Sequence, residues 1–297
     1  MYKGIITPIV TPFHRDEEQS INYEAASDLI EYVISHGVAG IFVLGSNGEF
    51  HVIDKKEKIE FTRRVVEMVD HRVPVFAGPG ACSTQETVQM AVEMEKAGVD
   101  ALSVIAPYFI QPSQQELYEH FATVARSVHI PVILYNIPRL SGVNISREVF
   151  EQLSLLDNIA GIKDSSRDLE NLQGYIEVAK KRNLSVLIGS DGIIAQGYRM
   201  GASGAIAGMS NVIPEVLCNL FQALKMHDDK AADELQKQVD VIRSVNKLAT
   251  MPAVLKRALE LAGIAEAGPA RKPGQETNSV LDAQIMDMLR YYQLVQE

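Results

Sequence analysis

The chain has 297 residues, of which 46% are hydrophobic and 22% are charged. These values are ordinary for a soluble, enzyme-sized globular protein, and they exclude a disordered chain, a collagen-like repeat and a small disulfide scaffold. The formal net charge is −10 and no basic stripe is visible, which argues against a surface for nucleic acid or anionic membrane. No apolar run reaches the roughly 18 residues of a transmembrane helix.

The sequence also predicts the compartment. The first 13 residues contain one lysine, a short apolar stretch and no small-residue cleavage site, so they are not typical of a signal peptide. Cys82 and Cys218 have neither pairing nor metal-ligand spacing, which suits a reducing cytoplasm. We therefore expect a cytoplasmic protein.

Eight short apolar runs, rich in valine, isoleucine and alanine, predict eight strands. They do not alternate strictly between apolar and polar residues, which is typical of parallel strands buried on both faces. The predicted strands are 5–10, 39–44, 74–77, 101–106, 131–135, 159–163, 185–188 and 204–207.

The segments between the strands have helical periodicity. In the first of them Ala26, Leu29, Ile30 and Val33 form one apolar stripe, and Gly37 stands where a helix would end. Capping pairs predict the starts of three later helices: Asp54 with Glu57, Ser83 with Glu86, and Ser113 with Glu116. The chain therefore alternates strand and helix eight times.

This alternation predicts an α/β fold, a (β/α)8 TIM barrel of about 250 residues. The rival is a doubly wound open sheet, but the first strand–helix turn lacks the G-x-G-x-x-G phosphate fingerprint of that fold. Helical pattern then continues without strands through 215–226, 230–247, 253–263 and 279–295. We expect a catalytic barrel over residues 1–226 and an appended C-terminal helical bundle over residues 227–297.

In such a barrel the functional site lies at the carboxyl ends of the strands. Lys163 closes the sixth predicted strand, which is otherwise apolar. Desolvation at this position would lower its pKa and make a neutral, nucleophilic amine available for Schiff-base chemistry. The alternative is a lysine beyond the strand end that is solvated and paired with Asp164.

Two further features lie at neighbouring strand ends. Tyr135 ends the fifth strand, where its phenol could shuttle protons for the lysine; the alternative is a core aromatic bonded to the backbone. Residues 45–48, Gly-Ser-Asn-Gly, offer a hydroxyl, an amide and backbone N–H groups that could hold a carboxylate; the alternative is a plain tight turn. The seven histidines are scattered without a ligand pair, so we expect no metal site.

These residues resemble the dihydrodipicolinate synthase / N-acetylneuraminate lyase family over essentially the whole chain. The resemblance rests on Gly45-Ser46-Asn47-Gly48-Glu49, Tyr135-Asn136-x-Pro138, Gly161-Ile162-Lys163-Asp164 and Pro107-Tyr108-Phe109. It implies a pyruvate-dependent class I aldolase or lyase, a homotetramer built from dimers that needs no metal or organic cofactor.

The resemblance also implies roles for individual residues. Lys163 would form the Schiff base with pyruvate or another 2-oxo acid, and Tyr135 would relay protons. Substrate-binding residues would be Ser46, Asn47, Gly189, Ile206, Tyr108 and Arg139. Ser46 and the backbone of Asn47 would hold the pyruvyl carboxylate.

Three departures bear on the substrate. Dihydrodipicolinate synthases have two threonines where Ser46 and Asn47 stand, a tyrosine in place of Phe109, and a carboxylate-binding arginine in place of Leu140, whereas Arg139 is one residue earlier. The chain looks more like 2-keto-3-deoxy sugar acid or 4-hydroxy-2-oxoglutarate aldolases. We therefore expect cleavage or formation of a 2-oxo-4-hydroxy acid, with pyruvate and an aldehyde as the partners.

Three alternatives stay open at this stage. One is a dihydrodipicolinate synthase that condenses pyruvate with aspartate semialdehyde. The second is a phosphate-handling barrel enzyme that uses the glycine loops at 189–192 and 208–211. The third is a catalytically silent barrel that binds a small oxo acid.

Overall fold

The computed structural model describes residues 1–296. Eight parallel strands close into a barrel, in which each strand pairs with its neighbours in sequence and the last pairs with the first. The strands are β1 (Gly4–Pro8), β2 (Gly40–Val43), β3 (Val75–Ala77), β4 (Ala101–Ile105), β5 (Val132–Asn136), β6 (Ile159–Asp164), β7 (Ser185–Ile188) and β8 (Gly204–Ile206). The predicted TIM barrel is confirmed.

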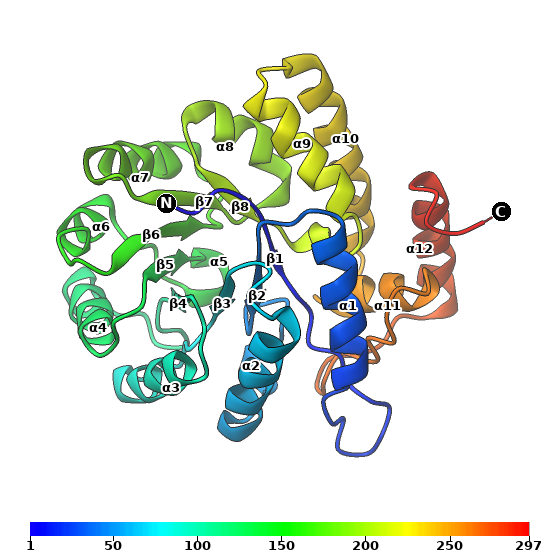
Figure 1. The fold of residues 1–297 in the computed structure, drawn as a ribbon, viewed down its shortest axis with the longest axis horizontal. Coiled ribbons are helices and arrows are strands. Elements are labelled where there is room, and N and C mark those ends of the chain that lie inside the picture. The colour runs from blue at the N-terminus through cyan, green and yellow to red at the C-terminus, as the bar shows by residue number, and fades with distance from the viewer. Residues whose placement is uncertain (297) are drawn as a thin grey trace.

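Helices connect the strands and surround the barrel, and α9 to α12 gather along one side of it (Figure 1). The α-helices are α1 (Tyr23–Ser35), α2 (Lys55–Val69), α3 (Thr84–Lys96), α4 (Gln114–Arg126), α5 (Pro138–Ser141), α6 (Arg147–Leu153), α7 (Leu169–Arg182), α8 (Ile194–Met200), α9 (Pro214–Lys225), α10 (Asp229–Asn246), α11 (Ala253–Leu261) and α12 (Ser279–Tyr291). Three 3₁₀ turns follow β2, β7 and β8: η1 (Phe50–Val52), η2 (Asp191–Ile193) and η3 (Gly208–Asn211).

All eight predicted strands are present, with small shifts at their ends. β2 stops before Leu44, because that residue has a left-handed backbone with φ 59°. Capping boxes form at Asp54 and Ser113. The third predicted box is only half formed: Ser83 accepts the N–H of Glu86, but the Glu86 side chain makes no return bond to the cap.

The predicted division at residue 226 stays a prediction. Contacts cross this division, because α10 packs along α9 and Gln236 of α10 forms hydrogen bonds with the loop after β7. The Gln236 amide donates to the carbonyl of Asp191 at 2.9 Å and accepts the N–H of Ala195 at 3.0 Å.

The barrel has two apolar cores. The larger lies between strands and helices, and the smaller fills the barrel with one side chain from each strand except β6. The inner core consists of Ile6, Phe42, Phe76, Ala101, Ile133, Leu187 and Ile206, each no more than 1% exposed. Layered packing of this kind makes the barrel interior a solid floor beneath the strand ends.

One buried histidine in the outer layer predicts a pH dependence of stability. His120 of α4 is 4% exposed, and its Nδ1 lies 2.9 Å from Thr84 Oγ1. Burial lowers its pKa from 6.5 to about 4. The unfolded chain therefore binds a proton between pH 6.5 and 4 that the folded chain does not, so stability is lost as the pH falls through this window.

We expect His120 to contribute a loss of about 2 kcal/mol between pH 7 and pH 5. The measurement compares thermal midpoints at the two pH values for the native chain and for His120→Gln. The variant is expected to lose less stability on acidification. An equal loss in both proteins would show that His120 does not cause the acid sensitivity.

Candidate active site

Lys163 lies inside the barrel at the carboxyl end of β6, where it is 4% exposed. Successive strand residues point to opposite faces, so Asp164 points outward. There the Asp164 carboxylate accepts bonds from Asn136 Nδ2 at 2.9 Å and Ser166 Oγ at 2.8 Å. Lys163 makes no ion pair within residues 1–296, so the alternative of a solvated lysine paired with Asp164 is wrong.

Aromatic rings surround the Lys163 amine. Its Nζ lies 3.8 Å from the ring centroid of Tyr135 and 5.1 Å from that of Phe42. The register explains the first contact, because Tyr135 of β5 pairs directly with Lys163 of β6. The amine is thus held in a mostly apolar setting, against ring faces rather than a carboxylate.

Tyr135 is equally buried, and its hydroxyl contacts the loop after β2. It is 4% exposed, and its hydroxyl oxygen lies 3.2 Å from Ser46 Oγ, where either group can donate. The alternative, a hydroxyl bonded to the backbone, is therefore wrong. Lys163, Tyr135 and Ser46 form one continuous group across β6, β5 and the loop after β2.

Residues 45–48, which we call the glycine turn, are held between two left-handed residues, Leu44 (φ 59°) and Glu49 (φ 55°). Thr11 fixes the turn by donating its hydroxyl to the carbonyl of Gly48 at 2.7 Å. In the described part of the chain, the N–H groups of Ser46, Asn47 and Gly48 donate to no other group. The turn therefore has free donors beside Tyr135, as an anion cradle requires.

Asn47 reaches across to the end of β8. A Cβ atom placed on Gly208 would lie 2.7 Å from Asn47 Nδ2, so only glycine leaves room for this amide. Beneath it, Ile206 belongs to the inner core with Phe42. Ile206 is 1% exposed, and the lining of a substrate pocket by Asn47 and Ile206 stays a prediction.

Gly189 makes room for Lys163 at the end of β7. A Cβ atom there would lie 2.9 Å from Lys163 Cε and would collide with Ser165 Oγ. The Ser165 hydroxyl is buried and has no hydrogen-bond partner within residues 1–296. Sequence reasoning did not single out Ser165, because only the packing reveals an unpartnered hydroxyl beside the lysine.

Within residues 1–296, no hydrogen bond, ion pair or ring contact joins two predicted binding residues, Tyr108 and Arg139, to this group. Tyr108 is half-buried and packs edge-on against Phe50 at 5.7 Å between ring centroids, and burial raises its pKa to about 12. Arg139 is exposed on α5 and forms no ion pair within the described chain. Leu140 beside it is 43% exposed, and Phe109 is 90% exposed.

The loops after β7 and β8 are tied to each other. The buried Asp191 carboxylate accepts the N–H groups of Gly208 at 3.3 Å and Met209 at 3.0 Å, and burial raises its pKa. These donors are therefore occupied by a carboxylate of the chain. That arrangement disfavours the phosphate-handling alternative, which needs free N–H groups in these loops.

Metal and membrane features can be checked over the same residues. Within residues 1–296 no group of three or more His, Cys, Asp or Glu side chains is arranged to hold a metal ion. None of the helices described for this chain has the length and apolar character that crossing a membrane requires.

Comparisons with known proteins show the family to which the chain belongs. The model of the dihydrodipicolinate synthetase family matches residues 1–291. A 4-hydroxy-tetrahydrodipicolinate synthase of Methanoculleus marisnigri is 33% identical over 289 residues, 97% of this chain and 99% of that protein. An uncharacterized DapA-like lyase of Halobacterium salinarum is 34% identical over 289 residues, 96% of this chain and 93% of that protein.

Solved structures give the same result. YagE, a prophage protein of the dihydrodipicolinic acid synthase family from E. coli K12 in complex with pyruvate, matches with a TM-score of 0.94 and 31% identity. The match covers 99% of this chain and 100% of that chain. The barrel and its relatives thus define an enzyme, a lyase of the class I aldolase type. The chain belongs to the dihydrodipicolinate synthetase family, whose members use a pyruvate Schiff base on a lysine.

Proposed function

We propose that this enzyme cleaves or forms a 2-oxo-4-hydroxy acid, such as a 2-keto-3-deoxy sugar acid, with pyruvate and an aldehyde as the other partners. The observation that carries the proposal is the buried group of Lys163, Tyr135 and Ser46. It joins an amine without a carboxylate partner to a phenol and a hydroxyl, 3.2 Å apart, beside free N–H donors.

In this proposal the glycine turn binds the carboxylate of the 2-oxo acid. The Ser46 hydroxyl and the N–H of Asn47 donate to it, and the neutral surroundings strengthen these bonds to an anion. The 2-oxo carbon then lies near Lys163 Nζ. Gly189 is required beside the lysine, because a larger residue would push on Cε.

The chemistry follows from these positions. Lys163 Nζ adds to the 2-oxo carbon, water leaves, and the protonated Schiff base becomes an electron sink. Tyr135 takes the proton of the C4 hydroxyl, directly or through Ser46, and the C3–C4 bond breaks. The aldehyde departs, the enamine takes a proton at C3, and water releases pyruvate from the lysine.

Ser165 is a further binding group in this proposal. Its buried hydroxyl has no partner in the described chain and lies beside Lys163 and Gly189, where the C4 hydroxyl of the substrate would bond it. An unmade bond at a buried hydroxyl costs about 1–3 kcal/mol, so a substrate that supplies the partner gains about that much.

Ser165→Ala is therefore expected to lower kcat/KM for the 2-oxo-4-hydroxy acid by roughly 5- to 100-fold. The half-saturating concentration for pyruvate adduct formation should stay within about twofold, since pyruvate has no C4 hydroxyl. Steady-state kinetics and adduct titration measure the two values. If pyruvate binding weakens as much as kcat/KM falls, Ser165 supports Lys163 and does not select the substrate.

The main alternative is a 4-hydroxy-tetrahydrodipicolinate synthase, which the names of relatives favour. The carboxylate of the second substrate, aspartate semialdehyde, needs a cation, but Leu140 stands at the expected position and Arg139 is exposed. A panel of 2-keto-3-deoxy acids, 4-hydroxy-2-oxoglutarate and aspartate semialdehyde plus pyruvate decides between them. Turnover only with aspartate semialdehyde would overturn the aldolase proposal.

We further propose that the enzyme is a cytoplasmic homotetramer that needs no metal or organic cofactor. The family resemblance supports the assembly and the cofactor independence, and two free cysteines, Cys82 and Cys218, fit a reducing compartment. Light scattering of the purified protein is expected to give four times the chain mass of 32.7 kDa. Activity is expected to survive dialysis against EDTA.

A further inference from the structure

A buried ion pair stands directly behind the glycine turn. Glu49, the residue after the turn, directs its carboxylate toward Lys256 of α11. Its Oε1 lies 2.6 Å from Lys256 Nζ, and the two side chains are 3% and 1% exposed. Desolvation makes a buried pair of this kind weak support for stability, so its presence calls for another explanation.

The lowered pKa of Lys256 also indicates that the buried pair is a weak source of stability. Burial lowers it to about 8, and the attraction to Glu49 opposes this shift without cancelling it. Arg271 also lowers the pKa of Lys256, and Glu260 raises it. The charged lysine is therefore held at a net cost in free energy.

Residues 267–273, which we call the C-terminal strap, share this pair. Lys256 Nζ donates to the carbonyl of Pro269 at 2.7 Å, and the N–H of Arg271 donates to Glu49 Oε2 at 2.8 Å. The Arg271 guanidinium binds both oxygens of Glu57, at 2.6 and 2.8 Å. The strap thus joins the residue after the glycine turn to the first turn of α2.

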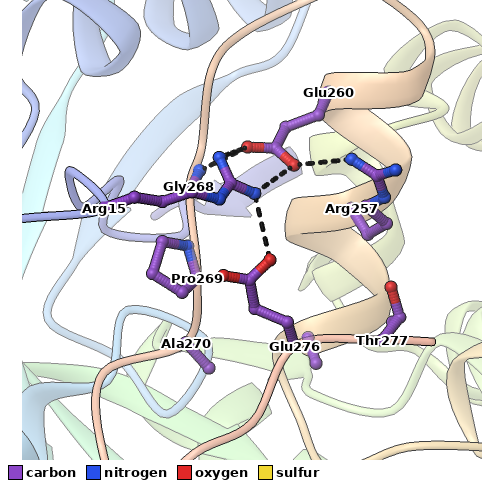
Figure 2. Close-up of a pocket in the computed structure, with 9 residues that line it drawn as sticks. Arg15, Arg257, Glu260, Gly268, Pro269, Ala270, Glu276 and Thr277 are labelled. Carbon is purple, nitrogen blue, oxygen red and sulfur yellow. Dashed lines mark hydrogen bonds and ion pairs between the residues drawn. The ribbon is translucent and has the colours of Figure 1, made fainter.

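A second set of ion pairs holds the strap near its start, at Gly268 (Figure 2). Glu260 of α11 accepts the N–H of Gly268 at 2.9 Å and binds Arg15 at 2.8 Å and Arg257 at 3.1 Å. Arg15 also reaches Glu276 at 3.2 Å. Because the strap is held both at Gly268 and at Arg271, it can act as a rigid support for Glu49.

The backbone of Glu49 shows why support is needed. Its φ of 55° is a left-handed conformation that a residue with a side chain adopts at a cost. The ion pair with Lys256 and the hydrogen bond from the Arg271 N–H hold its carboxylate, and the carbonyl of Pro269 in turn holds Lys256. Glu49 thus holds the carboxyl end of the glycine turn, while Leu44 and Thr11 hold the rest of it.

We propose that Glu49 and Lys256 are positioning residues that aim the glycine turn at the substrate carboxylate, with the C-terminal strap as their support. The inference rests on the proposed function in one respect, the binding of a carboxylate by the glycine turn. The C-terminal helical region is then a working part of the site rather than an appendage to the barrel.

The test replaces Lys256 by Met, which fills similar space without charge, and Glu49 by Gln, which keeps its shape. A binding group displaced by about 1 Å can lose about 10²-fold. Lys256→Met is expected to raise the half-saturating pyruvate concentration for borohydride-trapped adduct about 10- to 100-fold, and Glu49→Gln at least about threefold. The kcat at saturating pyruvate should stay within about threefold, since Lys163 and Tyr135 are not touched.

Two further variants separate positioning from stability. The double variant Glu49→Gln/Lys256→Met leaves no buried unpaired charge, and it is expected to recover part of the thermal midpoint but not the pyruvate affinity. Arg199→Met breaks the ion pairs of Arg199 in α8 with Asp229 and Asp233 in α10, both at 2.8 Å and outside the strap, and serves as the control. It is expected to lower the thermal midpoint and leave pyruvate half-saturation within about twofold.

Several outcomes would overturn the inference. Unchanged pyruvate affinity in Glu49→Gln or Lys256→Met, with or without a lower thermal midpoint, would assign the pair to stability alone. An equal shift in Arg199→Met would show that the loss of any ion pair around the barrel weakens pyruvate binding. If Lys256→Met does not fold, Glu49→Gln decides. A native enzyme that forms no adduct would instead refute the proposed function, so the two failures are distinguishable.

Discussion

Lys163→Ala is expected to abolish turnover while the barrel stays folded. Lys163 supplies the only covalent bond that joins substrate to protein in the proposed reaction, and removing a covalent nucleophile typically costs more than about 10⁴-fold in rate. Its amine contacts the rings of Tyr135 and Phe42 and forms no ion pair within residues 1–296, so its loss leaves no carboxylate unpaired. Steady-state kinetics with the 2-oxo-4-hydroxy acid and a thermal melt measure both effects.

A matched lysine controls for general effects of removing an amine. Lys181 of α7 is 59% exposed and pairs with Glu151 at 2.8 Å on the outer surface. Lys181→Ala should keep native turnover and a native adduct. Retained turnover or a pyruvate–borohydride adduct in Lys163→Ala would refute the assignment of Lys163.

Tyr135→Phe is expected to lower kcat by about 10²- to 10⁴-fold, the range for loss of a general acid–base. The change removes only the hydroxyl that lies 3.2 Å from Ser46 Oγ. The ring that faces Lys163 and Phe42 remains, so the geometry of the amine should be preserved. The adduct with pyruvate should still be trapped, but more slowly.

Tyr32→Phe is the matched control for this variant. The Tyr32 hydroxyl donates to the carbonyl of Val212 at 2.9 Å, away from the site, and burial raises its pKa to about 12. Its removal should lower the thermal midpoint and leave kcat unchanged. A fall in kcat of less than about threefold in Tyr135→Phe would exclude the general acid–base role.

Much of the fold could be predicted because local patterns and the barrel agree. Apolar runs marked every strand, and the predicted C-terminal helices lie within a few residues of α9 to α12. The ends of the strands were less predictable where the conformation of a single backbone residue determines them. β2 stops at Val43 because Leu44 is left-handed, and nothing in a run of apolar residues indicates that change.

The candidate site was predictable where strand position alone brings residues together. Lys163 and Tyr135 end adjacent strands and pair in register, so their contact follows from the barrel. Contacts made by long side chains were not predictable. The strap meets the residue after the glycine turn through Arg271 and Glu49, which are 222 residues apart in sequence. The free hydroxyl of Ser165 likewise depends on packing that periodicity does not encode.

The structure and the family comparison exclude some of the alternatives that the sequence leaves open and disfavour others. The solvated Lys163 and the backbone-bonded Tyr135 are wrong, because Asp164 bonds Asn136 and Ser166 and the phenol meets Ser46. The phosphate-handling barrel is disfavoured by Asp191, which occupies two N–H groups of η3. A silent oxo-acid binder disagrees with the family to which the chain belongs, a family of lyases.

Borohydride reduction in the presence of pyruvate, followed by intact mass and peptide mapping, tests the Schiff-base mechanism most directly. We predict one reduced pyruvate adduct per chain, located on Lys163 and absent from Lys163→Ala. A folded protein that gains no mass, or one modified at another lysine, would contradict the proposed chemistry.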